Sequence, residues 1–242
     1  MNFTYGEYIK LIDLLKEKNY HFCSYLDCDR YNKSVIFRHD IDTSLDKALD
    51  IARLEHKNNI SSTFFVLLST DFYNIFSKKS NDIIKDIISL GHQIGLHFDE
   101  KSYPINNVKD LEYYIKKEIS VLECAVGKKI QVVSMHRPSK WILENDVQFD
   151  GIINSYSKKY FSDFKYLSDS RMHWREDVIG IIKSELYNKL HILTHPFWYS
   201  EKEETMGEKL TKFIDRAKVE RYYNLKDNIR DLNDVINEGD IV

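Results

Sequence analysis

The sequence lacks the features that would indicate a secreted or membrane-spanning protein. Its three cysteines, Cys23, Cys28 and Cys124, have no Cys-x-x-Cys spacing, so they predict reduced thiols and not a disulfide framework or a zinc knuckle. The amino terminus has no basic stretch followed by an apolar one, and no segment approaches the roughly 18 uninterrupted apolar residues of a membrane span. We therefore expect a cytoplasmic protein without membrane insertion.

The net charge is small, and chain-breaking residues are few. The formal net charge is -3 and there is no run of basic residues, which argues against a nucleic-acid partner and favours a neutral or small substrate. Only eight glycines and three prolines occur, with no linker, repeat or low-complexity segment. With 43% hydrophobic residues the 242-residue chain can bury a sizeable core, so we expect one domain over residues 1–242.

Seven short apolar runs predict β-strands. Most of them are nearly continuously apolar, which is typical of strands buried on both faces of a parallel sheet. The predicted strands cover residues 34–38, 62–68, 93–97, 131–136, 151–155, 165–168 and 190–194.

Helical patterns separate several of these strands. A capping box, Thr4-x-x-Glu7, opens a predicted helix over residues 4–19, and a highly charged helical tail is expected over 206–237. Alternating strands and helices predict right-handed crossovers and parallel strands. The later connections are too short for regular crossover helices. The predicted fold is therefore α/β, a single-domain distorted or incomplete (β/α) barrel of about seven parallel strands.

The segment from Phe37 to Asp42 concentrates charge at the end of the first predicted strand. Asp40 and Asp42 are two residues apart, so on an extended backbone they point the same way. Two neighbouring carboxylates repel each other unless a cation or a shared proton lies between them. The segment alone leaves a second interpretation open, in which Asp42 caps the next helix and Asp40 pairs with Arg38.

Polar side chains follow most of the predicted strands. In a parallel barrel the carboxyl ends of the strands meet on one face, where active sites of such folds are built. Four histidines converging there with aspartates favour a divalent-metal or acid–base site. The residues at the strand ends are His39, Asp40, Asp42, His97, Asp99, His136, Arg137, Asp169 and His195.

Over residues 34–198 this series resembles the polysaccharide deacetylases of the NodB-homology, carbohydrate esterase family 4 type. Asp40 and Asp42 match the family's first motif, in which one aspartate is a general base and the other a metal ligand. The segment from Gly91 to His97 is similar to the second motif, which supplies metal-binding histidines. The resemblance implies a metal-dependent hydrolase that removes an N-acetyl or similar acyl group from an amino sugar, in cell-surface polysaccharide or glycan precursor metabolism.

The later motifs are matched less closely. Arg137-Pro138 agrees with the third motif in residue types but not in spacing, and Leu193-Thr194-His195 matches the last one. The resemblance implies that His195 is the general acid and that Arg137 holds the base Asp40. Asp169 and Trp174 fall in a segment similar to the fourth motif. They are the expected substrate-binding residues together with His39, and Tyr156 or Trp198 could add a stacking surface.

One departure from the family pattern concerns the metal. Lys101 stands where the family has its second metal histidine, and a protonated lysine cannot ligate a metal. A catalytic zinc site needs about three protein ligands. We therefore expect Asp42, His97 and, as the third ligand, His136, with Asp99 and His39 in reserve. Zinc is the first choice of metal, and other divalent ions are compatible.

The expected partner is a small molecule or glycan precursor that contains an amino sugar, such as a nucleotide-linked or lipid-linked sugar. Two alternatives remain at this point. The chain could be a metal-free relative that binds a glycan or sugar nucleotide without hydrolysing it, as Lys101 would favour. It could also hydrolyse another small amide.

Overall fold

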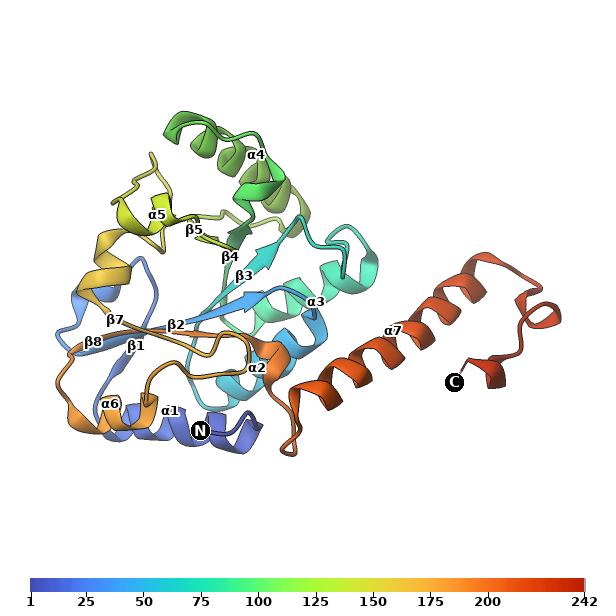
Figure 1. The fold of residues 1–242 in the computed structure, drawn as a ribbon, viewed down its shortest axis with the longest axis horizontal. Helices are drawn as coiled ribbons and strands as arrows, with labels where there is room; N and C mark the ends of the chain where they lie inside the picture. The colour runs from blue at the N-terminus through green and yellow to red at the C-terminus, as the bar shows by residue number, and fades with distance from the viewer. Residues whose placement is uncertain (242) are drawn as a thin grey trace. The chain divides into compact units, whose positions relative to one another are not determined.

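The computed structural model describes residues 1–241, and for Asp240 only the backbone (Figure 1). The chain divides into two compact units, Met1–Glu201 and the segment that starts at Lys202. None of the helices in the described residues combines the length and the apolar character that crossing a bilayer requires.

The first unit contains one sheet of eight strands, all paired in parallel. Along the sheet the order is β6-β5-β4-β3-β2-β8-β7, and β1 pairs with β2 outside this path. Between β6 and β7 the described residues form no pairing, so the barrel stays open there. The strands are β1 (His21–Cys23), β2 (Ser34–Ile41), β3 (Thr63–Leu67), β4 (Gln93–Phe98), β5 (Val132–Met135), β6 (Ile153–Asn154), β7 (Lys165–Ser168) and β8 (Lys189–Thr194).

Helices precede or connect these strands. Those of the first unit are α1 (Tyr5–Glu17), α2 (Leu45–Lys57), α3 (Lys78–Ser89), α4 (Val108–Val126), α5 (Lys140–Glu144) and α6 (Val178–Ser184). Its short turns are the 3-10 segments Cys28–Arg30, Glu100–Ser102 and Pro196–Trp198 and the π turn Lys159–Asp163.

The second unit is mostly one helix, α7 (Met206–Asn228). A capping box starts it, because the Thr205 side chain accepts from the Glu208 N–H and the Glu208 carboxylate accepts from the Thr205 N–H. Two 3-10 turns follow, Leu232–Asp234 and Glu238–Asp240, and the Tyr222 hydroxyl donates to Asn233 Oδ1 at 2.8 Å.

The predicted incomplete (β/α) barrel is confirmed. Each predicted strand has a counterpart in the sheet, and only β1, at three residues, was not anticipated. The helix ends are also where the glycines indicate: Gly91, just after α3, and Gly127, the C-cap of α4, have φ values of +93° and +67°, in the region that favours glycine.

The two faces of the sheet differ in the side chains they carry, as β2 illustrates. Side chains alternate along a strand, so Val35, Phe37 and Ile41 face the main apolar cluster under the helices. Ile36 faces the other way, into a smaller cluster with Phe65 and Val132. We call this second side the inner face. Because Arg38, Asp40 and Asp42 have the parity of Ile36, they continue the inner face toward the carboxyl end of the strand.

Gly95 of β4, the strand beside β3, makes room for the apolar residues of the inner face. The Phe65 ring lies so close to Gly95 that a Cβ atom there would be 2.5 Å from a ring carbon. The ring in turn lies under the Arg38 guanidinium, whose central carbon is 5.2 Å from its centroid. The floor of the inner face is therefore closely packed beneath the charged residues.

Candidate active site

Three strand ends bring a carboxylate and two imidazoles together on the inner face. Asp42 follows β2, His97 lies in β4 and His136 follows β5, and these strands belong to one continuous parallel sheet. The distances between Asp42 Oδ1, His97 Nε2 and His136 Nδ1 are all 3.2 Å. We call these three residues the inner cluster. Their ligand atoms form a compact triangle that could hold a metal ion.

The triangle suits a tetrahedral divalent ion. Bonds of about 2.0–2.1 Å to nitrogen and oxygen place neighbouring ligand atoms about 3.3 Å apart in a tetrahedron, close to the spacing here. Asp42 Oδ1 is buried and has no hydrogen-bond partner, although the two imidazoles are near it. Two nitrogens and one oxygen form a donor set that zinc accepts, with a fourth position left for water.

The surroundings fix how these ligands are presented. His97 Nδ1 lies 3.2 Å from the Ser134 carbonyl, and this contact orients Nε2 toward Asp42. The Tyr73 hydroxyl donates to the Ile41 carbonyl, and the Thr70 hydroxyl donates to the Asp42 carbonyl. These two hydrogen bonds fix the backbone at the end of β2. Burial raises the pKa of Asp42, but the nearby His136 and His97 imidazoles lower it more, to well below its usual value.

The helix-cap interpretation of Asp42 is wrong. Ser44 is the N-cap of α2, and its side chain accepts from the Lys47 N–H. This leaves the Asp42 carboxylate free for the inner cluster.

Asp40 is held by an arginine of its own strand. Both carboxylate oxygens accept from Arg38, one from Nε at 2.9 Å and the other from Nη2 at 2.8 Å, and Asp40 Oδ2 is 3.5 Å from His97 Nε2. Burial raises the pKa of Asp40, but the charge and hydrogen bonds of Arg38, together with the nearby His97 and His195, lower it more, so the pKa lies below its usual value. Arg38 has no exposed surface and also donates to Ser134 and Ser155.

The prediction that Arg137 holds Asp40 is therefore wrong. Its side chain is 62% exposed, and its nearest carboxylate is Asp99 at 3.7 Å. The physical reason is the pleat: Arg38, two residues before Asp40, shares its face and reaches it without a bend. Arg137 instead lines the cavity above the cluster.

His195 lies beside the cluster, with Nε2 3.9 Å from Asp42 Oδ2. Its Nδ1 is 2.7 Å from Asp169 Oδ1, and its backbone N–H also donates to that carboxylate. Burial lowers the pKa of His195, but the hydrogen bond and charge of Asp169 raise it to about 9. At neutral pH His195 is thus an imidazolium with Nε2 toward the cluster.

Asp169 consequently has a different task from the predicted substrate binding. It is completely buried, and besides His195 it accepts from the Tyr199 hydroxyl at 3.0 Å. Its carboxylate is held between His195 and Tyr199 and does not line the cavity, so we correct its role from substrate binding to positioning of His195.

His39, another predicted substrate-binding residue and reserve ligand, lies on the opposite face of β2. It is completely buried, with Nε2 2.9 Å from Glu55 Oε1 and Nδ1 2.7 Å from Thr194 Oγ1. Its odd parity relative to Asp40 and Asp42 turns it away from the inner face. His39 therefore does not reach the site.

Trp174 does not line the cavity either. It is partly buried and packs against the main apolar cluster, whereas Tyr156 does line the cavity. The other reserve ligand, Asp99, accepts from the Lys101 N–H at 3.1 Å and lies near Arg137, so it stands apart from the inner cluster.

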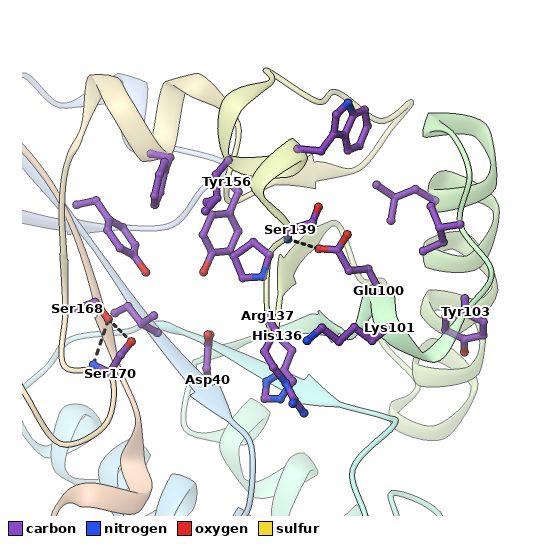
Figure 2. Close-up of a pocket in the computed structure, with 18 of the residues that line it drawn as sticks. Asp40, Glu100, Lys101, Tyr103, His136, Arg137, Ser139, Tyr156, Ser168 and Ser170 are labelled. Atoms are coloured by element: carbon purple, nitrogen blue, oxygen red, sulfur yellow. Dashed lines mark hydrogen bonds between the residues drawn. The ribbon is translucent and has the colours of Figure 1, made fainter.

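A cavity of about 1160 Å³ opens above the inner face (Figure 2). Asp40, His136 and His195 line it, and Lys101 and Arg137 lie beside His136. Figure 2 also shows Ser168 and Ser170 on the other side of Asp40 from Lys101. The predicted base, acid and third ligand thus face one space, while their catalytic and ligand roles stay predictions.

No protein-family model matches the sequence, and no curated protein matches it either. Among solved structures, the chain is similar to a family 4 carbohydrate esterase from Bacillus anthracis, with 17% identity over 85% of this chain and 83% of that one and a TM-score of 0.44. It is also similar to the chitin deacetylase of the fungal pathogen Colletotrichum lindemuthianum, with 16% identity over 75% and 81% of the two chains and a TM-score of 0.45.

A third similar structure is a CE4-family pseudoenzyme from Bacillus anthracis. The identity is 14% over 76% of this chain, the TM-score is 0.44, and the match spans 62% of that chain, which is less than two thirds of its length. Similarity at this level says nothing about activity. Roles for individual side chains must therefore come from the contacts in the site itself.

Proposed function

We propose that the chain is a metal-dependent hydrolase that removes an acyl group, such as acetyl, from the nitrogen of an amino sugar. The observation that supports this activity most directly is the inner cluster, with the carboxylate of Asp40 3.5 Å from His97 Nε2 and the imidazolium of His195 3.9 Å from Asp42 Oδ2. Amide hydrolysis needs a base for water and an acid for the amine, and the Asp40 carboxylate and the His195 imidazolium suit these two roles.

Asp42, His97 and His136 would hold the divalent ion. When bound there, the ion would lower the pKa of a bound water molecule and polarise the amide carbonyl. The compact donor triangle and the unpartnered oxygen of Asp42 both support this assignment.

Asp40 is the proposed base. Arg38 keeps it ionised and fixes its orientation, so it can accept a proton from the attacking water as the new carbon–oxygen bond forms. A freely rotating carboxylate would lose much of this advantage, because proton transfer requires the acceptor at a defined position.

His195 is the proposed acid. It donates its Nε2 proton to the departing nitrogen while the carbon–nitrogen bond breaks, so an amine leaves and not an amide anion. Asp169 keeps the proton on His195 by raising its pKa to about 9. The products are the free amino sugar and a carboxylate such as acetate.

The proposed substrate is an amino-sugar-containing small molecule or glycan precursor. The test is release of acetate and of a free amine from a panel of N-acetylated amino sugars, with the purified chain before and after chelation and after zinc is restored. We expect release that stops on chelation, returns with zinc and is lost in Asp40→Asn. Asp13→Asn, an exposed acid on α1, is the matched control. A metal-loaded chain that releases no acyl group from any sugar contradicts the proposal.

A further inference from the structure

The cavity is larger than the proposed reaction needs. At about 1160 Å³ it exceeds the roughly 300–1,000 Å³ of pockets that enclose drug-sized ligands. Asp40, His136 and His195 occupy only part of its wall. A single amino sugar would leave most of this space filled with water, so the remaining wall can contact a further part of the substrate.

That remaining wall is strongly cationic. Apart from His195, four lining side chains are cations, which we call the outer cations: Lys101, Arg137, Arg171 and Arg175. The only lining carboxylates are Asp40 and Glu100. Arg38 neutralises Asp40, and one oxygen of Glu100 accepts from the Ser139 N–H at 2.5 Å (Figure 2).

Two of the outer cations have no counter-charge in the described residues. Arg171 and Arg175 form no ion pair or side-chain hydrogen bond there, and Arg175 is not compensated by its neighbour Glu176, because both Glu176 oxygens accept from Lys165. Both side chains are exposed and line the cavity, so an anion that enters it can reach their uncompensated charges.

The turn that carries Arg171 is strained. Arg171 and Met172 have φ values of +58° and +54°, and residues 1–241 contain no other two consecutive non-glycine residues with positive φ. Such strain persists only where the surroundings impose it, and it gathers at ligand-binding sites. Here the turn follows Asp169, the residue that positions His195, and the His173 N–H donates back to the Asp169 carbonyl at 3.2 Å. The loop after β7 thus carries both Arg171 and the aspartate that positions His195.

We propose that the cavity recognises a phosphoryl group on the amino sugar, through Arg171 and Arg175. The substrate class is then a glycosyl phosphate or diphosphate, and the neutral substrate expected from the net charge is not the best fit to this cavity. The substrate assignment rests on the proposed function, in which the acylamino group reaches the inner cluster while the phosphoryl group lies on the β7 side.

Phosphate suits this arrangement better than a carboxylate does. It has two negative charges near neutral pH and enough oxygens for two guanidinium groups, each of which can bind in a forked geometry. Lys101 and Arg137, beside His136 and on the other side of Asp40 from Ser168, add to the positive potential of the cavity as a whole.

The test measures binding of reaction products, so that it does not depend on turnover. Titration calorimetry compares glucosamine with glucosamine 1-phosphate and with UDP-glucosamine, and the same three compounds in the galactosamine series, on the zinc-loaded full chain. We expect at least one phosphorylated form to bind about tenfold or more tightly than its neutral sugar. The monophosphate and the nucleotide diphosphate distinguish the two sources of the group.

Charge-removal variants locate the effect. In Arg171→Gln/Arg175→Gln the preference for the phosphorylated sugar should fall about tenfold, and in Arg171→Lys/Arg175→Lys part of it should return. Arg53→Gln/Lys85→Gln, which removes two exposed charges from α2 and α3, should keep the full preference.

Equal binding of neutral and phosphorylated sugars, or an unchanged preference in the double glutamine variant, would overturn the proposal. A preference that disappears on chelation would also overturn it, because the phosphate would then bind the metal. Tight binding of phosphorylated sugars by a chain that releases no acetate would support this site and contradict only the proposed hydrolysis.

Discussion

Two clusters of histidine and carboxylate lie on opposite faces of β2, and they differ in what their polar atoms contact. The outer cluster consists of Glu55, His39 and His92. Glu55 accepts from Tyr8, His39 and Ser62 at 2.5–2.9 Å, and His92 Nε2 is 2.9 Å from the Ala52 carbonyl. Its hydrogen bonds are complete and its residues are buried.

The inner cluster has the same residue types with incomplete contacts. Asp42 Oδ1 is buried without a hydrogen-bond partner, and two imidazole nitrogens point at it from 3.2 Å. A buried polar atom that lacks a partner costs roughly 1–3 kcal/mol, so it persists where a ligand completes it. A structural histidine cluster therefore differs from a candidate site in whether its hydrogen bonds are complete, and not in its residue types.

Removing a ligand of the inner cluster should have the largest effect. In Asp42→Ala and His97→Ala we expect bound metal to fall from one ion per chain to less than about one tenth. Acyl hydrolysis should fall by about a thousandfold or more, because several kcal/mol of transition-state stabilisation are lost. Elemental analysis and an acetate assay measure both effects. Unchanged metal content in both variants would show that the ion binds elsewhere.

Removing the outer carboxylate should instead destabilise the fold. Glu55→Ala leaves the donors of Tyr8 and Ser62 and the His39 imidazole buried without their partner, which costs about 3–5 kcal/mol of the free energy of unfolding. Urea titration measures this, with Glu17→Ala on the exposed face of α1 as control. Folded chains should keep their metal, and a loss of metal without a loss of stability would reverse the assignment of the two clusters.

The third variant alters the pH dependence of the inner site. His195 must keep its proton to act as an acid, so hydrolysis should decline as the pH rises through about 9. Burial lowers the pKa of His195, and the hydrogen bond and charge of Asp169 raise it. In Asp169→Asn the pKa falls, the alkaline limb moves to lower pH, and the rate at pH 8 drops about 10- to 100-fold. A pH–rate profile whose alkaline limb does not move would mean that His195 is not the acid.

The buried carboxylate of Glu118 has only part of its hydrogen bonds, and we expect its substitution to have the smallest effect. Glu118 accepts from the Tyr103 hydroxyl at 2.7 Å, while its other oxygen is buried without a partner. Burial raises the pKa of Glu118 to about 7. The folded chain therefore binds this proton more tightly than the unfolded chain does. The stabilisation that comes from the protonated Glu118 is fully present below about pH 4.5 and is lost as the pH rises through about 7.

Glu118→Gln removes this ionisation. At pH 8 we expect the free energy of unfolding of the variant to exceed that of the parent by about 1–3 kcal/mol. Near pH 4 this difference should disappear. Urea titrations at the two pH values, with Glu17→Gln as control, measure the difference. An equal effect at both pH values would rule out the shifted ionisation.

Much of the fold could be predicted because its signals are local. Nearly continuous apolar runs indicate buried parallel strands, and the glycines mark the ends of α3 and α4. The strand β1 could not be predicted, since His21–Cys23 is too short for a pattern and forms only by pairing with β2.

The site was predictable in part. The strand ends indicate which residues meet, and the pairing of Asp40 with Arg38 was one of two interpretations left open. The same period of two that aligns Asp40 with Asp42 also places His39 on the other face, so that signal was present in the sequence. The role of Asp169 could not be predicted, because its distance to His195 depends on how β7 and β8 pair.

The pairing of β2 with β8 has a consequence for how the chain acquires its site. His39 and Thr194 are register partners although 155 residues separate them, so the proposed base and the proposed acid come from opposite ends of the first unit. Contacts of such long sequence separation form slowly, because a large loop must close first. On a ribosome, a chain that already contains Asp40 still lacks His195 until β8 has been synthesised. The proposed base and acid therefore come together late, with the closing of the sheet, and a chain without β8 still lacks the proposed acid.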